Sequence, residues 1–360
     1  MIEAIETTFR ELARIDSPSE QEQQVASYLQ KQLISLGLEV NVDEIGNVIG
    51  YLPSEGEPIL LNAHMDGVPL SKGHVPVKEG DILHSDGSTN LRADDIAGIS
   101  IILEATRSIV NGKKKHPPLI LACTVQEEIG SRGAKALDLT RYHVKRGLVY
   151  DNAFKAGVVV SRGAAYVAFD VEIKGKEAHP GKDLSQGVNA LSVFLDIGND
   201  IHIGDLDNGR TKLNIGTVSA GKARNVVPGN VTLQGEVRSF LNKEQLAKRI
   251  THLKSLFDSA AKRNGAEVTF TTNQLAVAYE IGGDEPLVQK YKHIIEKHGG
   301  TFETKETFVA SDANPLRGEK GLEVFVVSTG VENDHSVNET VSLSDLELLT
   351  KDLISLLTTS

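Results

Sequence analysis

Three short apolar segments, each followed by a charged or imidazole side chain, constrain the fold of this chain most. Each reads as a buried strand with such a residue at or just beyond its carboxyl end: Ile59–Ala63 with His64, Leu119–Thr124 with Glu127 and Glu128, and Leu148–Tyr150 with Asp151. Strands alternating with helical segments imply a largely parallel sheet covered on both faces. Imidazole and carboxylate converging from several strand ends is what a metal site in an open α/β sheet requires.

The pair Asp94-Asp95 stands where a loop ends and an apolar-periodic segment begins. Alone, such a pair indicates an ordinary helix N-terminus, because carboxylates are favoured at the positive end of the helix dipole. Other candidate metal ligands in the chain favour a different interpretation, since His64-Met65-Asp66 lies upstream and His335 lies near the end of the chain. We therefore take Asp94 as a candidate metal ligand.

The N-terminal part predicts helices and short strands around these segments. Residues 3–14 look helical, and Ser19-Glu20-Gln21-Glu22 reads as a capping box that opens a second helix, with Gly37 as its stop. Residues 67–88 are rich in Gly, Asp and Ser, which indicates an irregular surface loop.

From about residue 164 the pattern changes to a half-exposed alternation, in which Val167, Phe169 and Val171 are separated by polar residues. The expected order β-α-β-β-α-β is typical of a ferredoxin-like sandwich. A chain of 360 residues also exceeds the size at which one core keeps growing. We therefore expect an α/β catalytic domain in two segments, 1–163 and 274–360, with an inserted α+β lid and dimerisation domain at 164–273.

Charge and cysteine content exclude several classes of protein. The net charge of −11 disfavours nucleic acid and anionic membranes as partners. The single cysteine, Cys123, excludes an internal disulfide and a thiolate zinc site. No apolar run is long enough to span a bilayer, and the acidic N-terminus is unlike a signal peptide, so we expect a cytoplasmic protein.

The motifs together resemble the metal set of the M20 metallopeptidase family, and within it the peptidase T (tripeptidase) branch. The resemblance covers nearly the whole chain, including the inserted domain. It is carried by His64-x-Asp66, Ala93-Asp94-Asp95, Glu127-Glu128, Asp151 and His335. Taken one at a time, His64 would be interpreted as a core histidine, Glu127-Glu128 as an exposed acidic turn and His335 as a loop histidine. That all of them occur by chance in the family's order and at its spacing is improbable.

The resemblance implies two divalent metal ions bridged by Asp94. One ion would be completed by His64 and Asp151, the other by Glu128 and His335. Neutral imidazole with carboxylates suits Zn²⁺, and Mn²⁺ or Co²⁺ would fit such ligands too. Two such ions can share a hydroxide that attacks the peptide carbonyl.

The remaining catalytic roles also come from the resemblance. Glu127 would be the general base that takes a proton from the bridging water and returns it to the leaving nitrogen. Asp66 would fix the orientation and tautomer of His64. A cis peptide bond is implied between Asp94 and Asp95.

The inserted domain carries a second group of residues that resemble family motifs. His179, in Gly175–Gly181, resembles the histidine that reaches into the partner subunit's site, and Asn225 and Arg238 resemble a clamp for the substrate carboxylate. Without the resemblance, His179 would be a turn residue and Arg238 an exposed strand-end charge. The exposed edge of such a sandwich can pair with a copy of itself, so we expect a homodimer through this domain. Ser311–Asn314 matches a loop that lines the site, without a definite role.

The sequence departs from the branch at three places: Asn90-Leu91-Arg92 stands for Leu-Leu-Gly, Ile96 for a common lysine, and Asn152 for the glycine after Asp151. No ligand is removed, so the metal site is expected to survive while substrate preference can differ.

The leading hypothesis is a dinuclear aminopeptidase or tripeptidase of short peptides. The alternative is an M20 amidohydrolase of N-acyl amino acids or other small amides. The related M42 aminopeptidases carry their extra domain between the His-x-Asp motif and the bridging aspartate, whereas Asp66 and Asp94 are too close here for any domain. A noncatalytic binding protein on this scaffold would be expected to lack a ligand or Glu127.

Overall fold

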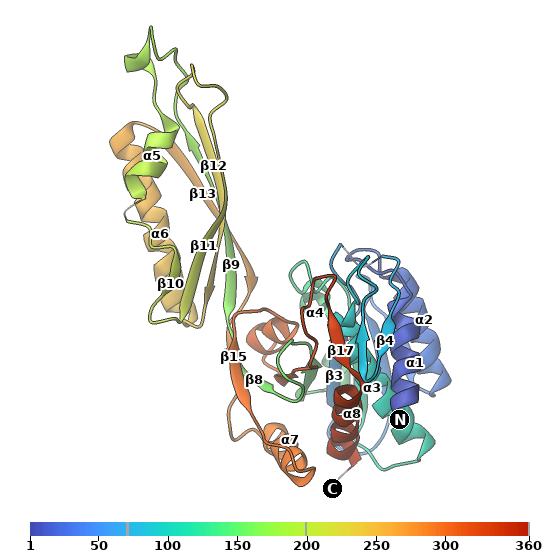
Figure 1. Ribbon diagram of the computed structural model, residues 1–360. Helices are drawn as coiled ribbons and strands as arrows, with labels where there is room; N and C mark the ends of the chain where they lie inside the picture. The colour runs from blue at the N-terminus through green and yellow to red at the C-terminus, as the bar shows by residue number, and fades with distance from the viewer. Residues whose placement is uncertain (70–71, 199, 359–360) are drawn as a thin grey trace. The chain divides into compact units, whose positions relative to one another are not determined.

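The computed structural model describes residues 1–69, 72–198 and 200–358. The chain forms two compact units, one made of Met1–Gly163 with Tyr279–Ser360 and the other of Ala164–Ala278 (Figure 1). The second unit ends beyond residue 273 because its last strand, β13, runs as Glu267–Ala276. Each unit has its own hydrophobic core. None of the helices in the described ranges combines the length and the apolar character needed to cross a bilayer.

The first unit is built on a mixed sheet in which the expected parallel arrangement is confirmed for the central strands. The sheet order is β1 (Glu39–Val42), β2 (Val48–Leu52), β6 (Leu119–Thr124), β3 (Ile59–His64), β7 (Arg146–Tyr150), β16 (Glu323–Val327), β8 (Val159–Gly163) and β14 (Tyr279–Glu280), with β15 (Thr304–Thr307) beside β8. Strands β6, β3, β7 and β16 run parallel, whereas the outer pairs β1–β2, β2–β6, β16–β8 and β14–β8 are antiparallel. The carboxyl ends of the central strands therefore share one edge.

The helices of the first unit pack against this sheet and one another. They are α1 (Ile2–Ala13), α2 (Gln23–Ser35), α3 (Ala93–Asn111), α4 (Arg132–Ala136), α7 (Pro286–Lys297) and α8 (Leu343–Thr358), with single turns at Thr140–Tyr142 and Asn314–Glu319. Helix α3 contacts β3, β7, α1 and α8. Its approach to β7 depends on Gly98, where a Cβ would lie 2.5 Å from the carbonyl oxygen of Tyr150. Any larger residue there would push α3 and the loop before it away from the sheet.

The predicted capping box of the second helix is wrong. Helix α2 begins at Gln23 with Glu22 as its N-cap, and no side chain caps it. The Ser19 hydroxyl instead donates to Asp66 Oδ2 at 2.7 Å, and Glu20 adopts a positive φ of 72°. Ser19 therefore makes a hydrogen bond to a residue distant in sequence, Asp66, and does not cap the helix as the local sequence predicted.

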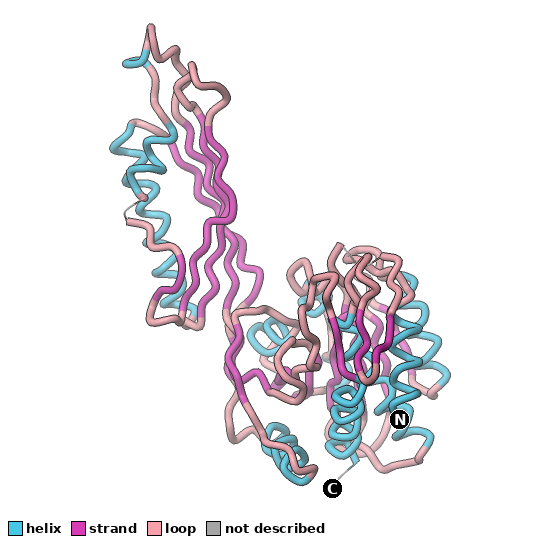
Figure 2. The backbone as a smooth tube through the Cα atoms, in the orientation of Figure 1, coloured by secondary structure: helices cyan, strands magenta, loops and turns pink. Residues whose placement is uncertain are grey.

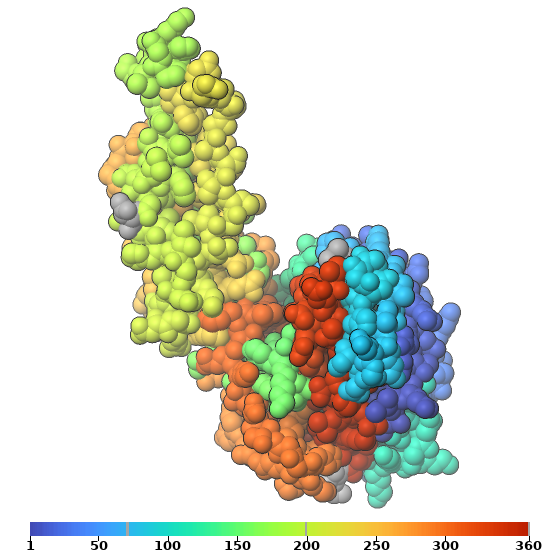
Figure 3. Space-filling view, in the orientation of Figure 1, coloured from blue at the N-terminus to red at the C-terminus, as the bar shows by residue number. Residues whose placement is uncertain are grey.

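The prediction of an irregular loop over residues 67–88 is also wrong in part. It contains β4 (Val77–Glu79) and β5 (Ile82–His84), which pair with each other, and β5 pairs with β17 (Thr340–Ser342) near the C-terminus. Figure 3 shows this segment in light blue beside the red C-terminal segment on the surface. The strands are short, and Leu83 opposite Val341 is the pair that is buried. Because the partner is distant in sequence, local periodicity could not indicate the pairing.

The second unit has the expected ferredoxin-like arrangement, with one extra edge strand. It contains β9 (Ala165–Lys174), α5 (Ala190–Ile197), β10 (Gly204–Leu206), β11 (Thr211–Ala220), β12 (Asn230–Ser239), α6 (Lys243–Asn264) and β13, with a single turn at Leu184–Gln186. The antiparallel sheet runs β10-β11-β12-β9-β13, and both helices lie on one side of it (Figure 2). The alternating residues Val167, Phe169 and Val171 are buried, and Phe169 stacks on Phe270 in this core.

Candidate metal and active site

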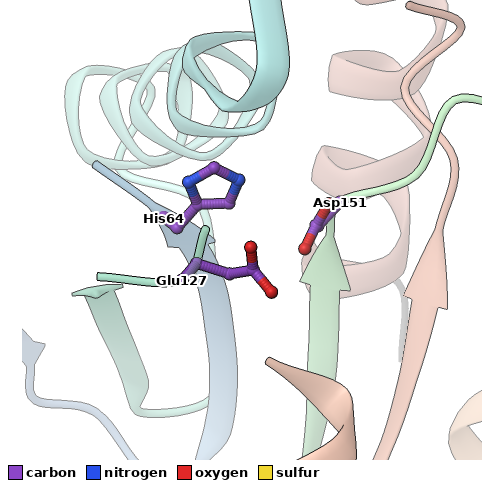
Figure 4. A group of neighbouring side chains, drawn as sticks. All are labelled: His64, Glu127 and Asp151. Atoms are coloured by element: carbon purple, nitrogen blue, oxygen red, sulfur yellow. The ribbon is translucent and has the colours of Figure 1, made fainter. Parts of the chain in front are cut away.

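Imidazole and carboxylate groups meet at the carboxyl ends of three central strands of the first unit. His64 is the last residue of β3, Glu127 follows β6, and Asp151 follows β7. One ligand atom from each lies within 4.8 Å of the others, and the three side chains turn toward one another (Figure 4). The register explains the meeting, because β3 pairs in parallel with both β6 and β7.

Asp94 lies between two histidines and belongs to two further groups of this kind. Its Oδ1 is 3.0 Å from His64 Nε2, and its Oδ2 is 3.1 Å from His335 Nε2. His335 Nε2 is also 3.0 Å from Glu128 Oε1. The groups that could hold an ion are His64 with Asp94 and Glu128, and Asp94 with Asp334 and His335. The expected cis peptide between Asp94 and Asp95 is confirmed.

The grouping differs in three details from the ligand sets that the resemblance implies. Glu128, expected in one set with His335, is grouped with His64 and Asp94. Glu127, expected beside the ions without binding one, lies in a possible ligand group with His64 and Asp151. Asp334, to which the sequence analysis gave no role, lies in the group with Asp94 and His335. The side chain of His335 is 46% exposed, whereas that of His64 is 1% exposed, so one end of the cluster faces solvent.

The electrostatics of the cluster are those of carboxylates crowded in the interior. Burial raises the pKa of Glu127 well above its ordinary value, and the neighbouring charge of Asp151 raises it further. Burial also raises the pKa of Asp94, but hydrogen bonds from His335 and His64 outweigh it and hold that pKa below the usual range. The same bond to Asp94, with one to Glu128, raises the pKa of His335 to about 11. Several acids and two histidines therefore compete for protons in a small volume.

These residues fit divalent metal ions. Asp151 Oδ2 is buried and has no hydrogen-bond partner among the described residues. His64 Nδ1 lies 3.0 Å from the backbone carbonyl of Asp66. In the neutral tautomer that donates there, Nε2 carries no proton for Asp94, and its lone pair is available to an ion. Imidazole nitrogen with carboxylate oxygen is a donor set that Zn²⁺ accepts readily and that Mn²⁺ or Co²⁺ tolerates.

Asp66 contacts backbone groups and a hydroxyl in addition to His64. Its carboxylate is 3.4 Å from His64 Nδ1, so the backbone carbonyl, not the carboxylate, is the nearer partner of that nitrogen. The carboxylate accepts the backbone N–H groups of Glu127 at 2.9 Å and Glu128 at 3.2 Å, as well as the Ser19 hydroxyl. It therefore holds the Glu127-Glu128 loop against the end of β3.

Two other buried acids were missed or left without a role. Glu339 is fully buried and accepts the backbone N–H of Arg92 at 2.7 Å and that of Asp94 at 3.0 Å. Burial raises its pKa to about 7. Asp312, in the loop that resembled a family motif, accepts from Thr124 Oγ1 and from Asn62 Nδ2. A lone glutamate in a polar loop gives no local signal of burial. Asp312 could be noticed because the motif Ser311–Asn314 resembles a loop that lines the family's site.

The predicted substrate-binding residues all lie in the second unit, and the structure brings only two of their loops together. His179 and Asn225 are exposed on neighbouring loops, joined by a backbone hydrogen bond from Val227 N–H to the carbonyl oxygen of Ala178 at 2.9 Å. His179 Nδ1 accepts the Gly181 N–H at 3.1 Å, which places the ring proton on Nε2.

Arg238 lies near the opposite end of β12 from the Asn225 loop. Its guanidinium stacks on the Tyr166 ring, 4.1 Å from the centroid, and pairs with Glu236 at 3.2 Å. A carboxylate that binds Arg238 must therefore compete with Glu236.

Comparison with known proteins gives a consistent result. The sequence model of peptidase family M20/M25/M40 matches residues 60–359. An aminopeptidase PepT from Bacillus cereus is 28% identical with a TM-score of 0.93, over 99% of this chain and 98% of that one. A tripeptidase from Staphylococcus aureus is 26% identical with a TM-score of 0.94, over 99% and 98% of the two chains. The uncharacterized protein YqjE from Bacillus subtilis is 28% identical over 94% of this chain and 93% of its own.

Proposed function

This chain belongs to peptidase family M20/M25/M40, and from that premise we propose that it is a dinuclear metal-dependent aminopeptidase. The substrates would be short peptides, tripeptides above all, from which it removes the N-terminal residue. The observation that carries this proposal is the meeting of His64, Asp94 and Glu128 with Glu127 and Asp151 at one sheet edge. The nearly full-length similarity to an aminopeptidase PepT and a tripeptidase supports the substrate class.

Two divalent ions, most simply Zn²⁺, would be held around Asp94. His64 and Asp151 would complete one set of ligands, and Glu128 and His335 the other. Both oxygens of Asp94 already face an imidazole nitrogen, at 3.0 and 3.1 Å, which is the arrangement that a shared ligand needs. When bound, such ions polarise the peptide carbonyl and lower the pKa of a water molecule.

Glu127 is the residue proposed to move the proton. Burial and the charge of Asp151 raise its pKa, so this carboxylate has a strong tendency to accept a proton in the closed environment of the site. Its Oε1 accepts the Ser131 hydroxyl at 3.0 Å, which fixes the side chain. Glu127 would take a proton from the attacking water and deliver it to the nitrogen of the leaving group.

The second unit would bind the substrate and form a homodimer. His179, with its proton on Nε2, is a suitable donor to the carbonyl oxygen as negative charge develops there. We propose that it acts on the site of the partner subunit, so that His179→Ala lowers turnover by about 10²–10³-fold without changing metal content. Asn225 and Arg238 lie near opposite ends of β12 in one chain, so they would bind the substrate carboxylate from different subunits. Arg238 would exchange its pairing with Glu236 for the substrate.

A kinetic screen of di-, tri- and N-acylated peptides, each with Zn²⁺, Mn²⁺ and Co²⁺, tests the proposed function. The proposal predicts the highest kcat/KM on a tripeptide with a free amino terminus, and loss of that activity when the amine is acetylated. Higher kcat/KM on N-acyl amino acids would favour the alternative, an amidohydrolase of that class. The expected cytoplasmic location stays a prediction, which fractionation of cells tests.

A further inference from the structure

A buried arginine stands two residues before Asp94, at a position where the resembling branch has glycine. Arg92 adopts φ 62° and ψ 29°, the left-handed region that glycine favours. Its side chain is completely buried, although a buried guanidinium is costly without partners. Both the left-handed backbone and the buried positive charge of Arg92 are unfavourable by themselves, so neighbouring groups must stabilise them.

Among the described residues, the guanidinium makes no direct ion pair and is compensated by backbone carbonyls. Nη2 donates to the carbonyl oxygen of Met65 at 2.7 Å, and Nη1 donates to those of Leu12, at 3.3 Å, and Ile15. Leu12 lies in the last turn of α1 and Ile15 two residues beyond its end, where the helix dipole favours a cation. Met65 stands between His64 and Asp66. Arg92 thus connects the end of α1 to the peptide that joins two site residues.

The backbone of the same residue is held from another direction by Glu339. The two carboxylate oxygens accept separately, Oε2 from the Arg92 N–H at 2.7 Å and Oε1 from the Asp94 N–H at 3.0 Å. Glu339 lies on the segment that carries His335, and its own N–H donates to the Ser336 carbonyl oxygen at 3.2 Å. Asp94 is therefore tied to the loop of its other histidine neighbour.

We propose that Arg92 and Glu339 are positioning residues that hold Asp94 between His64 and His335. The guanidinium fixes the loop to the end of β3, and the carboxylate fixes it to the His335 segment. Neither is proposed to contact substrate. Since Asp94 lies 3.0–3.1 Å from both imidazoles, a small displacement of its backbone would lengthen both contacts. This inference rests on the proposed metal-binding function.

The test measures binding of Zn²⁺ to metal-stripped full-length protein by calorimetry, with the absorption spectrum of the Co²⁺ form as a second readout. Arg92→Met keeps most of the volume but removes every donor. Glu339→Gln keeps the shape but turns an amide N–H toward a backbone N–H. Both are expected to weaken metal binding by about 10- to 100-fold, as loss of outer-shell partners does, and to change the Co²⁺ spectrum. In turnover, kcat should fall while KM changes little.

A matched control separates positioning from general stability. Glu104 is also a buried glutamate of this core, 5% exposed, and it accepts the Thr8 hydroxyl at 2.6 Å. Glu104→Gln should leave metal affinity and the Co²⁺ spectrum unchanged. Arg92→Lys, which keeps the charge without the planar fork, should recover part of the affinity lost in Arg92→Met. If Arg92→Met fails to fold, Arg92→Lys and Glu339→Gln decide.

Two results would overturn the inference in distinguishable ways. Wild-type affinity and spectrum in Arg92→Met and Glu339→Gln, with metal bound normally by the wild type, would overturn the positioning role alone. Where Arg92→Met does not fold, the same result in Arg92→Lys and Glu339→Gln would overturn it. A wild-type protein that binds no divalent metal would overturn the proposed function, and the positioning role with it.

Discussion

The two units carry their functional residues in opposite ways. In the first unit, His64 and Asp66 are buried, and the loops that carry Asp94 and Glu127 are fixed by buried carboxylates. In the second unit, His179 and Asn225 are exposed on loops. Arg238 lies near the far end of a strand and is already paired with Glu236.

Under the proposed function, the difference concerns how far one chain by itself organises each half of the site. Charged groups are stable in the interior only with partners or a bound ion, so the first unit must arrange its acids as it folds. The second unit meets no such demand at His179 and Asn225, because both residues are exposed. We infer that the metal-binding half of the site is preorganised within one chain and that the substrate-binding half is assembled when two chains meet.

The largest effect is expected from removing the residue shared by the first unit's groups. Asp94→Ala should abolish turnover and lower both metal content and thermal stability, because both proposed ions lose a ligand. Plasma emission for metal content and a thermal melt measure this. Asp95→Ala is the matched control: Asp95 accepts the N–H groups of His64 and Gly98 at 3.2 and 3.0 Å, so it should cost about 0.5–2 kcal/mol of stability while retaining more metal. Equal metal occupancy in the wild type and Asp94→Ala would show that the bridge is elsewhere.

The next effect separates chemistry from metal binding within the same unit. Glu127→Gln should lower kcat by about 10²–10⁴-fold, since the amide cannot accept the proton, while metal content stays at the wild-type level. Metal analysis and steady-state kinetics on one preparation decide it. Near wild-type turnover would remove Glu127 from the role of base; loss of metal would make it a ligand, as its grouping with His64 and Asp151 allows.

A third effect compares the stability of the two units directly. Stripping the metal should destabilise the first unit alone, because an ion that binds the folded state at 100 times its Kd contributes about 2.7 kcal/mol. Hydrogen exchange followed by mass spectrometry resolves the units: peptides from β3 and β7 should lose protection, whereas peptides from β9 and β12 should not. Equal loss of protection in both units would contradict the proposed confinement of metal to the first.

The smallest effect is expected at the exposed loops of the second unit. Lys222 pairs with Glu177 at 2.7 Å beside the His179 loop, with side chains 74% and 48% exposed. Lys222→Ala should change the free energy of unfolding by less than about 1 kcal/mol, because solvent screens such a pair. Chemical denaturation measures this. A larger loss would mean that these loops are more firmly organised within one chain than we infer.

The sequence predicted which residues meet in the first unit's site, but it did not predict the buried residue Glu339, which holds the Asp94 loop. Strand ends in a parallel sheet converge whatever the details of packing, so His64, Glu127 and Asp151 could be placed from apolar runs alone. Their roles as ligands and base stay predictions. Glu339 could not be found, because its burial depends on contact with a loop far away in sequence.

Predictions from local patterns were wrong where a residue contacts a partner that is distant in sequence. Ser19 binds Asp66 instead of capping α2, and Leu83 is buried against Val341 in a sheet that the Gly- and Ser-rich segment did not indicate. The prediction of the second unit's strands needed only local periodicity, and the predicted ferredoxin-like order was correct. The pairing of Arg238 with Glu236 was not foreseen, although the two stand on one strand.

Mixing two inactive variants tests most directly whether the site is shared between chains. Purified Glu127→Gln and His179→Ala are mixed under conditions that allow subunits to exchange, and peptidase activity is followed with the composition of the dimers. If His179 of one subunit serves the site of the other, each mixed dimer holds one site with both residues intact, and its activity should return toward half that of a wild-type dimer. No recovery of activity in demonstrated mixed dimers, or a strictly monomeric active protein by light scattering, would contradict the account.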